Sequence, residues 1–171
     1  MVPIAMTAAR IFLCSTLLFA FPAFAQNEKP GTLQLPELGV ELPAEMGEFV
    51  FADRQQYEGD LGYSLSYGQK KGRISVYVYS RGVKDIGDGI ESKAVETELA
   101  TSARELQAYA DTGRITDLSE VEIDEDLAAV TEDAFAIKAW EFNMPGGGAT
   151  SFTFVRGQKD HFVKIRATLY V

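Results

Sequence analysis

Apolar and polar residues alternate along most of the chain after residue 48, a pattern typical of β-strands that bury one face. We expect three such strands before residue 82 and four more after residue 114. The predicted strands are 49–54, 57–68, 73–81, 115–123, 134–143, 150–157 and 161–171. Between the two groups the hydrophobic period changes from two residues to that of a helix.

Residues 92–111 form the segment with the helical period. Its apolar stripe consists of Val95, Leu99, Ala103, Leu106 and Ala110. Ser92 stands where an N-cap belongs, and Gly113 stands where a helix commonly ends. The order β-β-β-α-β-β-β-β predicts an α+β domain, with an antiparallel sheet of about seven strands and one main helix packed on one face.

The alternation also predicts which residues face each other in the hairpins, because the pairing register decides which side chains share a face. A turn at 69–72 pairs Tyr67 with Ile74, Leu65 with Val76 and Tyr63 with Val78. A turn at 157–160 pairs Phe154 with Val163 and Phe152 with Ile165, and a hairpin before it places Trp140 opposite Thr153. Both faces of the sheet then carry large apolar side chains.

The width of such a sheet raises a question of coverage. Seven strands at ~4.8 Å each span about 30 Å, whereas one helix is only about 10 Å across. Three arrangements are open. The sheet curls around the helix, or the segment before residue 48 packs on the second face, or that face is partly open as a binding surface.

Residues 1–25 have the three regions of a cleaved signal peptide. Arg10 supplies the positive charge, residues 11–21 the apolar run, and Ala23-Phe24-Ala25 the small-residue site, so cleavage is expected between Ala25 and Gln26. The apolar run is about half of the ~20 residues that span a bilayer. We therefore expect a periplasmic or secreted protein that has no membrane span after cleavage.

Residues 26–47 carry Pro30, Pro36 and Pro43, a spacing that excludes a helix between them. We interpret this stretch as an extended, proline-containing lead-in whose leucines can lie in a groove on the folded body. No proline follows Pro43 until Pro145, which predicts a single α+β domain over 48–171.

The chain has a formal net charge of −9, which counts against nucleic acid as a partner because a phosphate binder needs clustered Lys and Arg. Its one Cys, at position 14, excludes a disulfide scaffold and a cysteine-based zinc site. Charge is unevenly distributed, however, because residues 134–171 hold five basic residues and two acidic ones. This local excess of positive charge permits a small anionic ligand.

The second face of the sheet combines rigid aromatic side chains with basic ones, which suits a ligand that has an apolar body and an anionic group. The candidate ligand-binding residues are Tyr77, Tyr79, Lys138, Trp140, Phe142, Lys164 and Arg166. The alternative is that the aromatic residues form a second core layer beneath the lead-in. If they form a site, Trp140→Ala or a charge reversal at Lys164 or Arg166 abolishes ligand capture without unfolding the domain.

Three other features suggest chemistry but fit simpler interpretations. His161 stands beside a charged turn with no visible partner to orient it, so we predict no catalytic residue. The acidic segment 120–133 can supply oxygen ligands for Ca²⁺ but lacks the spacing of an EF-hand, which favours a solvated strand end and loop. The Gly146-Gly147-Gly148 run indicates a flexible loop. We predict no metal and no cofactor.

The strand 73–79, a helix that begins near Ser92, and the closing strands 136–142, 151–155 and 162–166 resemble the PsbP-like fold, which includes bacterial envelope proteins of the DcrB type. The resemblance is one of element order and covers residues 48–171. It implies a non-enzymatic accessory or binding role outside the cytoplasm.

Three classes of function remain. The first is a non-catalytic binding or accessory protein of the envelope, with a protein partner or a small ligand. The second is a carrier of a small anionic amphiphile such as a lipid or fatty acid, which predicts a cavity between sheet and helix. The third is a carboxylate-based hydrolase, which predicts two acidic groups converging in a cleft.

Overall fold

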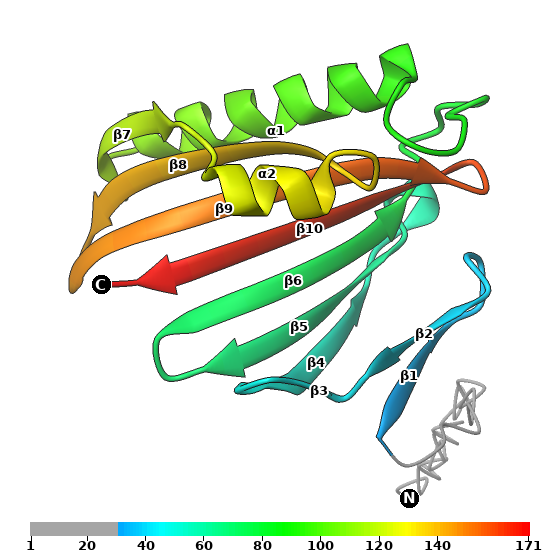
Figure 1. The fold of residues 1–171 in the computed structure, drawn as a ribbon, viewed down its shortest axis with the longest axis horizontal. Coiled ribbons are helices and arrows are strands. Elements are labelled where there is room, and N and C mark those ends of the chain that lie inside the picture. The colour runs from blue at the N-terminus through cyan, green and yellow to red at the C-terminus, as the bar shows by residue number, and fades with distance from the viewer. Residues whose placement is uncertain (1–30) are drawn as a thin grey trace, which may run out of the picture.

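The computed structural model describes residues 31–171 and builds them around an eight-stranded antiparallel sheet (Figure 1). Its strands are ordered β3-β4-β5-β6-β10-β9-β8-β7. They comprise β3 (Glu45–Met46), β4 (Phe49–Gln56), β5 (Tyr63–Gln69), β6 (Gly72–Tyr79), β7 (Thr116–Val121), β8 (Ala136–Met144), β9 (Gly147–Gln158) and β10 (His161–Tyr170). The predicted α+β class is confirmed. The predicted signal peptide, with Ala23, Ala25 and Gln26, lies outside the described residues.

The main helix, α1 (Lys93–Asp111), is where the sequence predicts it. The Ser92 hydroxyl accepts a hydrogen bond from the Val95 amide at 3.2 Å and caps the N-terminus. At the other end, the Gly113 amide donates to the Ala110 carbonyl at 2.8 Å, with Gly113 at a φ of 75°. The helix lies over β7, β8 and β9, at the opposite end of the strand order from β4 (Figure 1). Among the described residues, no helix is long and apolar enough to cross a membrane.

Three local predictions need correction. The Gly146-Gly147-Gly148 run is not a flexible loop, since β9 begins at Gly147, which pairs with Met144 in β8. The acidic segment after β7 is not wholly a loop, since it contains the short helix α2 (Glu125–Thr131). The Asp124 carboxylate caps this helix by accepting from the Asp126 amide at 3.0 Å. The predicted strand 57–68 is interrupted by a 3-10 turn at Gly59–Leu61, and β5 begins only at Tyr63.

The predicted registers are right in one hairpin and displaced in two. Pairing of β5 with β6 places Tyr63 opposite Val78 and Leu65 opposite Val76, as expected. In β9–β10, Phe154 faces Ile165 instead of Val163, because the turn is two residues, Lys159 and Asp160, both with positive φ. Trp140 faces Ser151 instead of Thr153. Each displacement is two residues, so every side chain keeps its predicted face.

The lead-in covers the first face of the sheet, not the second. Strands β1 (Thr32–Leu35) and β2 (Val40–Pro43) form a separate hairpin on the β4 side of the sheet (Figure 1). Leu33, Leu35 and Leu38 are at most 4% exposed and pack against the buried side chains of β5 and β6. The alternative that placed the lead-in over the aromatic and basic face is therefore wrong.

The second face is covered by α1, but only in part. Beneath the helix, one buried cluster contains Tyr79, Val95 and Phe162, and another contains Leu106 and Trp140. The loop that joins β6 to α1 closes one end of this layer, with Ile86 fully buried and an antiparallel bridge between Gly89 and Gly157. Since α1 lies over β7–β9, part of β6 and β10 is left to line a groove.

Candidate functional site

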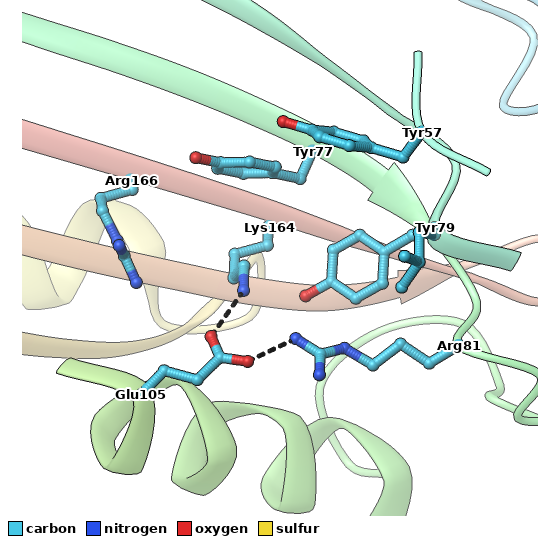
Figure 2. A pocket seen from close by; sticks show the side chains of 8 residues that line it. Tyr57, Tyr77, Tyr79, Arg81, Glu105, Lys164 and Arg166 are labelled. Carbon is cyan, nitrogen blue, oxygen red and sulfur yellow. Dashed lines mark hydrogen bonds and ion pairs between the residues drawn. The ribbon is translucent and has the colours of Figure 1, made fainter. Parts of the chain in front are cut away.

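The groove follows the flank of α1 and consists of two adjoining cavities. We call the smaller one, about 260 Å³, the cationic cavity, because Arg81, Lys164 and Arg166 line it (Figure 2). We call the larger one, about 560 Å³, the apolar cavity. Glu105 and Arg166 line both, so the two cavities meet at these two side chains.

The apolar cavity lies between the C-terminal half of α1 and strands β8–β10. Its apolar lining consists of Leu106, Tyr109, Ile115, Phe142, Met144 and Tyr170. Tyr109, Met144 and Tyr170 are exposed, and so the cavity opens to solvent at its rim. Two cations, Arg114 and Arg166, also line it. The cavity can thus take an apolar group, with positive charge available at more than one point.

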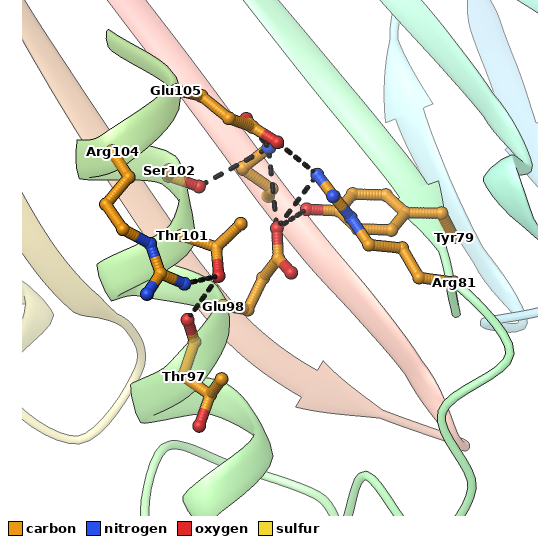
Figure 3. A network of polar contacts seen from close by, with 9 residues as sticks. Tyr79, Arg81, Thr97, Glu98, Thr101, Ser102, Arg104 and Glu105 are labelled. Carbon is orange, nitrogen blue, oxygen red and sulfur yellow. Dashed lines mark hydrogen bonds and ion pairs between the residues drawn. The ribbon is translucent and has the colours of Figure 1, made fainter. Parts of the chain in front are cut away.

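The cationic cavity rests on a buried ionic network (Figure 3). Glu98, only 5% exposed, accepts a hydrogen bond from the Tyr79 hydroxyl at 2.6 Å. The same carboxylate oxygen lies 3.6 Å from the Lys164 ammonium and 3.4 Å from the Arg81 guanidinium. Burial lowers the pKa of Lys164, although the charges of Glu105 and Glu98 oppose that shift. Glu98 is buried and does not line the cavity, but its charge compensates one of the positive charges that do.

Glu105 reaches into the groove from α1 and contacts the cations directly. Its carboxylate accepts a hydrogen bond from Arg81 at 2.7 Å and lies 3.7 Å from the Lys164 ammonium (Figure 2). Burial alone would raise the pKa of Glu105, but the Arg81 hydrogen bond and the charges of Lys164, Arg81 and Arg166 hold it below its usual value. Glu105 is ionised at neutral pH, and no other acidic residue of the described part of the chain lines either cavity.

Two of the three cations stand out, Arg81 by its backbone conformation and Arg166 by its lack of a side-chain partner. Arg81 has a φ of 54°, a backbone conformation that is rare outside glycine and is often found at functional sites. Arg166 is half-buried, and its side chain forms no hydrogen bond or ion pair with any other residue of the range 31–171. Its guanidinium, which is at the junction of the two cavities, is the cation left for an external anion.

Alkaline pH is expected to destabilise the domain through its buried phenols. Burial is the main cause that raises the pKa values of Tyr63, Tyr67 and Tyr79 above the ordinary 10.0. The folded state then resists ionisation that the unfolded chain undergoes, so this stability is complete below pH 10 and is lost as the pH rises above it. Among the groups with a shifted pKa that titrate at alkaline pH, Lys164 acts in the opposite sense, since its pKa is lowered.

Urea unfolding at about pH 8 and about pH 11 measures this effect, and Tyr79→Phe should weaken the dependence. An unchanged unfolding midpoint would contradict it.

The seven predicted site residues divide into three groups. Tyr77, Tyr79, Lys164 and Arg166 come together in the cationic cavity, and Phe142 lies in the apolar one. Trp140 is 4% exposed, belongs to the core beneath α1 and lines neither cavity. Lys138 is paired with Glu120 at 2.5 Å on the β7 side of the sheet, apart from the groove.

Sequence reasoning missed Arg81, Glu105 and Arg114. Glu105 comes from a helix face that the alternation pattern does not describe, and tertiary packing alone brings it to the sheet. Arg81 ends the predicted strand 73–81, and the alternation places it on the same face as Tyr77 and Tyr79, so the pattern could have identified it. Arg114 follows the predicted helix and could have been inferred to lie at its C-terminal end, where a cation is favourable.

The remaining chemical candidates are not assembled into a catalytic centre among the described residues. Asp117 and Glu141 share a cavity of about 310 Å³ at the β7 edge, but both are exposed, and Asp117 accepts a hydrogen bond from Asn143 at 2.8 Å. A glycosidase acid needs burial to stay protonated near neutral pH. Residues 31–171 contain no group of three or more His, Cys, Asp or Glu placed to hold a metal ion.

The chain matches no protein-family model, no curated protein and no solved structure.

Proposed function

We propose that the chain is an exported, non-catalytic binding protein that carries a small anionic amphiphile, such as a fatty acid, in the groove beside α1. The observation that carries this proposal is the junction of an apolar cavity with a cationic one at Arg166, whose guanidinium forms no hydrogen bond or ion pair with residues 31–171. An apolar body and an anionic group attached to it fit the two ends of one groove.

The size and lining of the groove support a ligand of this class. The apolar cavity, about 560 Å³, lies within the roughly 300–1,000 Å³ typical of small-molecule sites. Each Å² of apolar ligand surface buried there contributes about 25 cal/mol. Because Arg166 is half-buried, its charge-assisted hydrogen bonds to a carboxylate are partly shielded from water and gain strength.

The exported, non-catalytic part of the proposal rests on other support. The signal-peptide pattern of residues 1–25 favours export, and the resemblance to PsbP-like proteins favours a binding or accessory role. An accessory protein with a macromolecular partner is the neighbouring hypothesis. The groove favours a small ligand over that partner, because its two cavities, of about 260 and 560 Å³, have the size of a small-molecule site.

Titration with dodecanoate tests the proposal. We expect one molecule to bind per chain by isothermal titration calorimetry, and Arg166→Gln to weaken binding about tenfold, the ratio that corresponds to ~1.4 kcal/mol. Arg104→Gln is the matched control. It removes the same charge from the exposed side of α1, where the Arg104 side chain donates a hydrogen bond to Thr101. The control variant should bind dodecanoate as the unchanged chain does.

A second ligand tests the role of the charge. Dodecyltrimethylammonium has the same tail with the opposite charge, and it should not compete with dodecanoate. Equal binding of the two ligands, or an Arg166→Gln variant that binds dodecanoate unchanged, would contradict the proposal.

A further inference from the structure

The one carboxylate in the groove stands where an anionic ligand would be expected to bind. Glu105 lines both cavities, and its two oxygens engage Arg81 at 2.7 Å and Lys164 at 3.7 Å (Figure 2). It does so from an exposed position on α1, with 42% of its side chain accessible. Unlike Glu98, it is not locked in the core, and it can leave the groove by changing rotamer.

The charge balance of the cationic cavity depends on this residue. Arg81, Lys164 and Arg166 contribute three positive charges, and buried Glu98 offsets one of them. With Glu105 in place, one positive charge is left. When Glu105 has left the cavity, two positive charges are left, and buried Lys164 and partly buried Arg81 each lose one anionic partner. An anion entering the groove restores the balance that the departure of Glu105 disturbs.

We propose that Glu105 is an internal stand-in for the ligand's anionic group, and that it occupies the cation cluster when the groove is empty and is displaced when the ligand binds. This inference rests on the proposed function and names how that site is regulated. Glu105 competes with the ligand, and it also keeps the empty cavity from exposing uncompensated cations. Neutral or cationic amphiphiles cannot make the exchange, which gives the site its selectivity for anions.

The exchange also loosens the loop between β6 and α1. Arg81 belongs to that loop and is tied to α1 through Glu105 and Glu98. When the ligand takes the place of Glu105, Arg81 exchanges its ion pair with Glu105 for one with the ligand and keeps its ion pair with Glu98. Binding of the anionic group and the attachment of this loop to α1 are thereby coupled through a single guanidinium.

The test compares Glu105→Gln with the unchanged chain in dodecanoate titrations at low salt. Glutamine preserves the size of the side chain but removes the charge that competes, so dodecanoate should bind about tenfold more tightly, equivalent to ~1.4 kcal/mol. Glu96→Gln is the matched control, because it removes the same charge from an exposed position on α1 that is paired only with Lys93. The control should leave the affinity unchanged.

The outcomes separate this inference from the function on which it rests. Tighter binding by Glu105→Gln alone supports the exchange. Weaker binding by Glu105→Gln, or equal binding by all three proteins, overturns it and leaves the carrier function standing. Equal gains in Glu105→Gln and Glu96→Gln also overturn it, because net charge then explains the effect. If no protein of the set binds dodecanoate, the proposed function itself fails.

Discussion

Glu98→Ala is expected to lower the free energy of unfolding by about 3–5 kcal/mol, the usual loss when one partner of a buried ion pair is removed. Glu98 and Lys164 are each 5% exposed and lie 3.6 Å apart. Without Glu98, the buried ammonium keeps the carboxylate of half-exposed Glu105 at 3.7 Å and the neutral hydroxyl of Ser102 at 3.4 Å, and the Tyr79 hydroxyl loses its acceptor. Since domains of this size have about 5–15 kcal/mol in total, urea unfolding should detect the change easily.

Two further variants show whether the loss comes from the stranded charge. In the double variant Glu98→Leu/Lys164→Met, apolar side chains replace both charges, and most of the stability should return. Glu96→Ala is the exposed control, because its carboxylate is 69% accessible and pairs with Lys93 at 2.7 Å. That pair should contribute no more than about 1 kcal/mol. A loss below this value in Glu98→Ala would contradict a structural role for the pair.

The faces of the sheet could be predicted from the sequence, whereas the predicted pairing is right in one hairpin and displaced in two. Alternation with a period of two residues assigns a face to every side chain, and this assignment holds even where the register is displaced by two residues. The register itself depends on the length of the turns. Lys159 and Asp160 form a two-residue turn in which both residues have positive φ. Glycine and asparagine are the residues that usually indicate such a turn, and neither is present at these positions.

Which segment covers which face also lies beyond a pattern in the sequence. The buried leucines of the lead-in are equally compatible with either face, since nothing in their spacing distinguishes the two. Only some of the residues that line the cationic cavity could be predicted from the sequence. Lys164 and Arg166 stand on one strand with their face fixed by alternation, whereas Glu105 joins them from a separate element through tertiary packing.

Trp140→Ala should lower the free energy of unfolding by about 3–5 kcal/mol, because truncating a buried aromatic side chain loses transfer energy and leaves a cavity. Trp140 is 4% exposed and packs with Leu106 and Ile115 beneath α1. The sequence-based expectation that this variant keeps its fold and loses only its ligand is therefore replaced by the opposite one.

Tyr109→Ala is the matched control for Trp140, because it removes an aromatic side chain that is 44% exposed at the rim of the apolar cavity. It should cost less than about 1 kcal/mol, as surface substitutions do. Equal unfolding free energies for the two variants would mean that Trp140 is not part of the packed core between α1 and the sheet. Unequal ones place the boundary between core and site at the groove, with Trp140 on the core side and Tyr109 on the other.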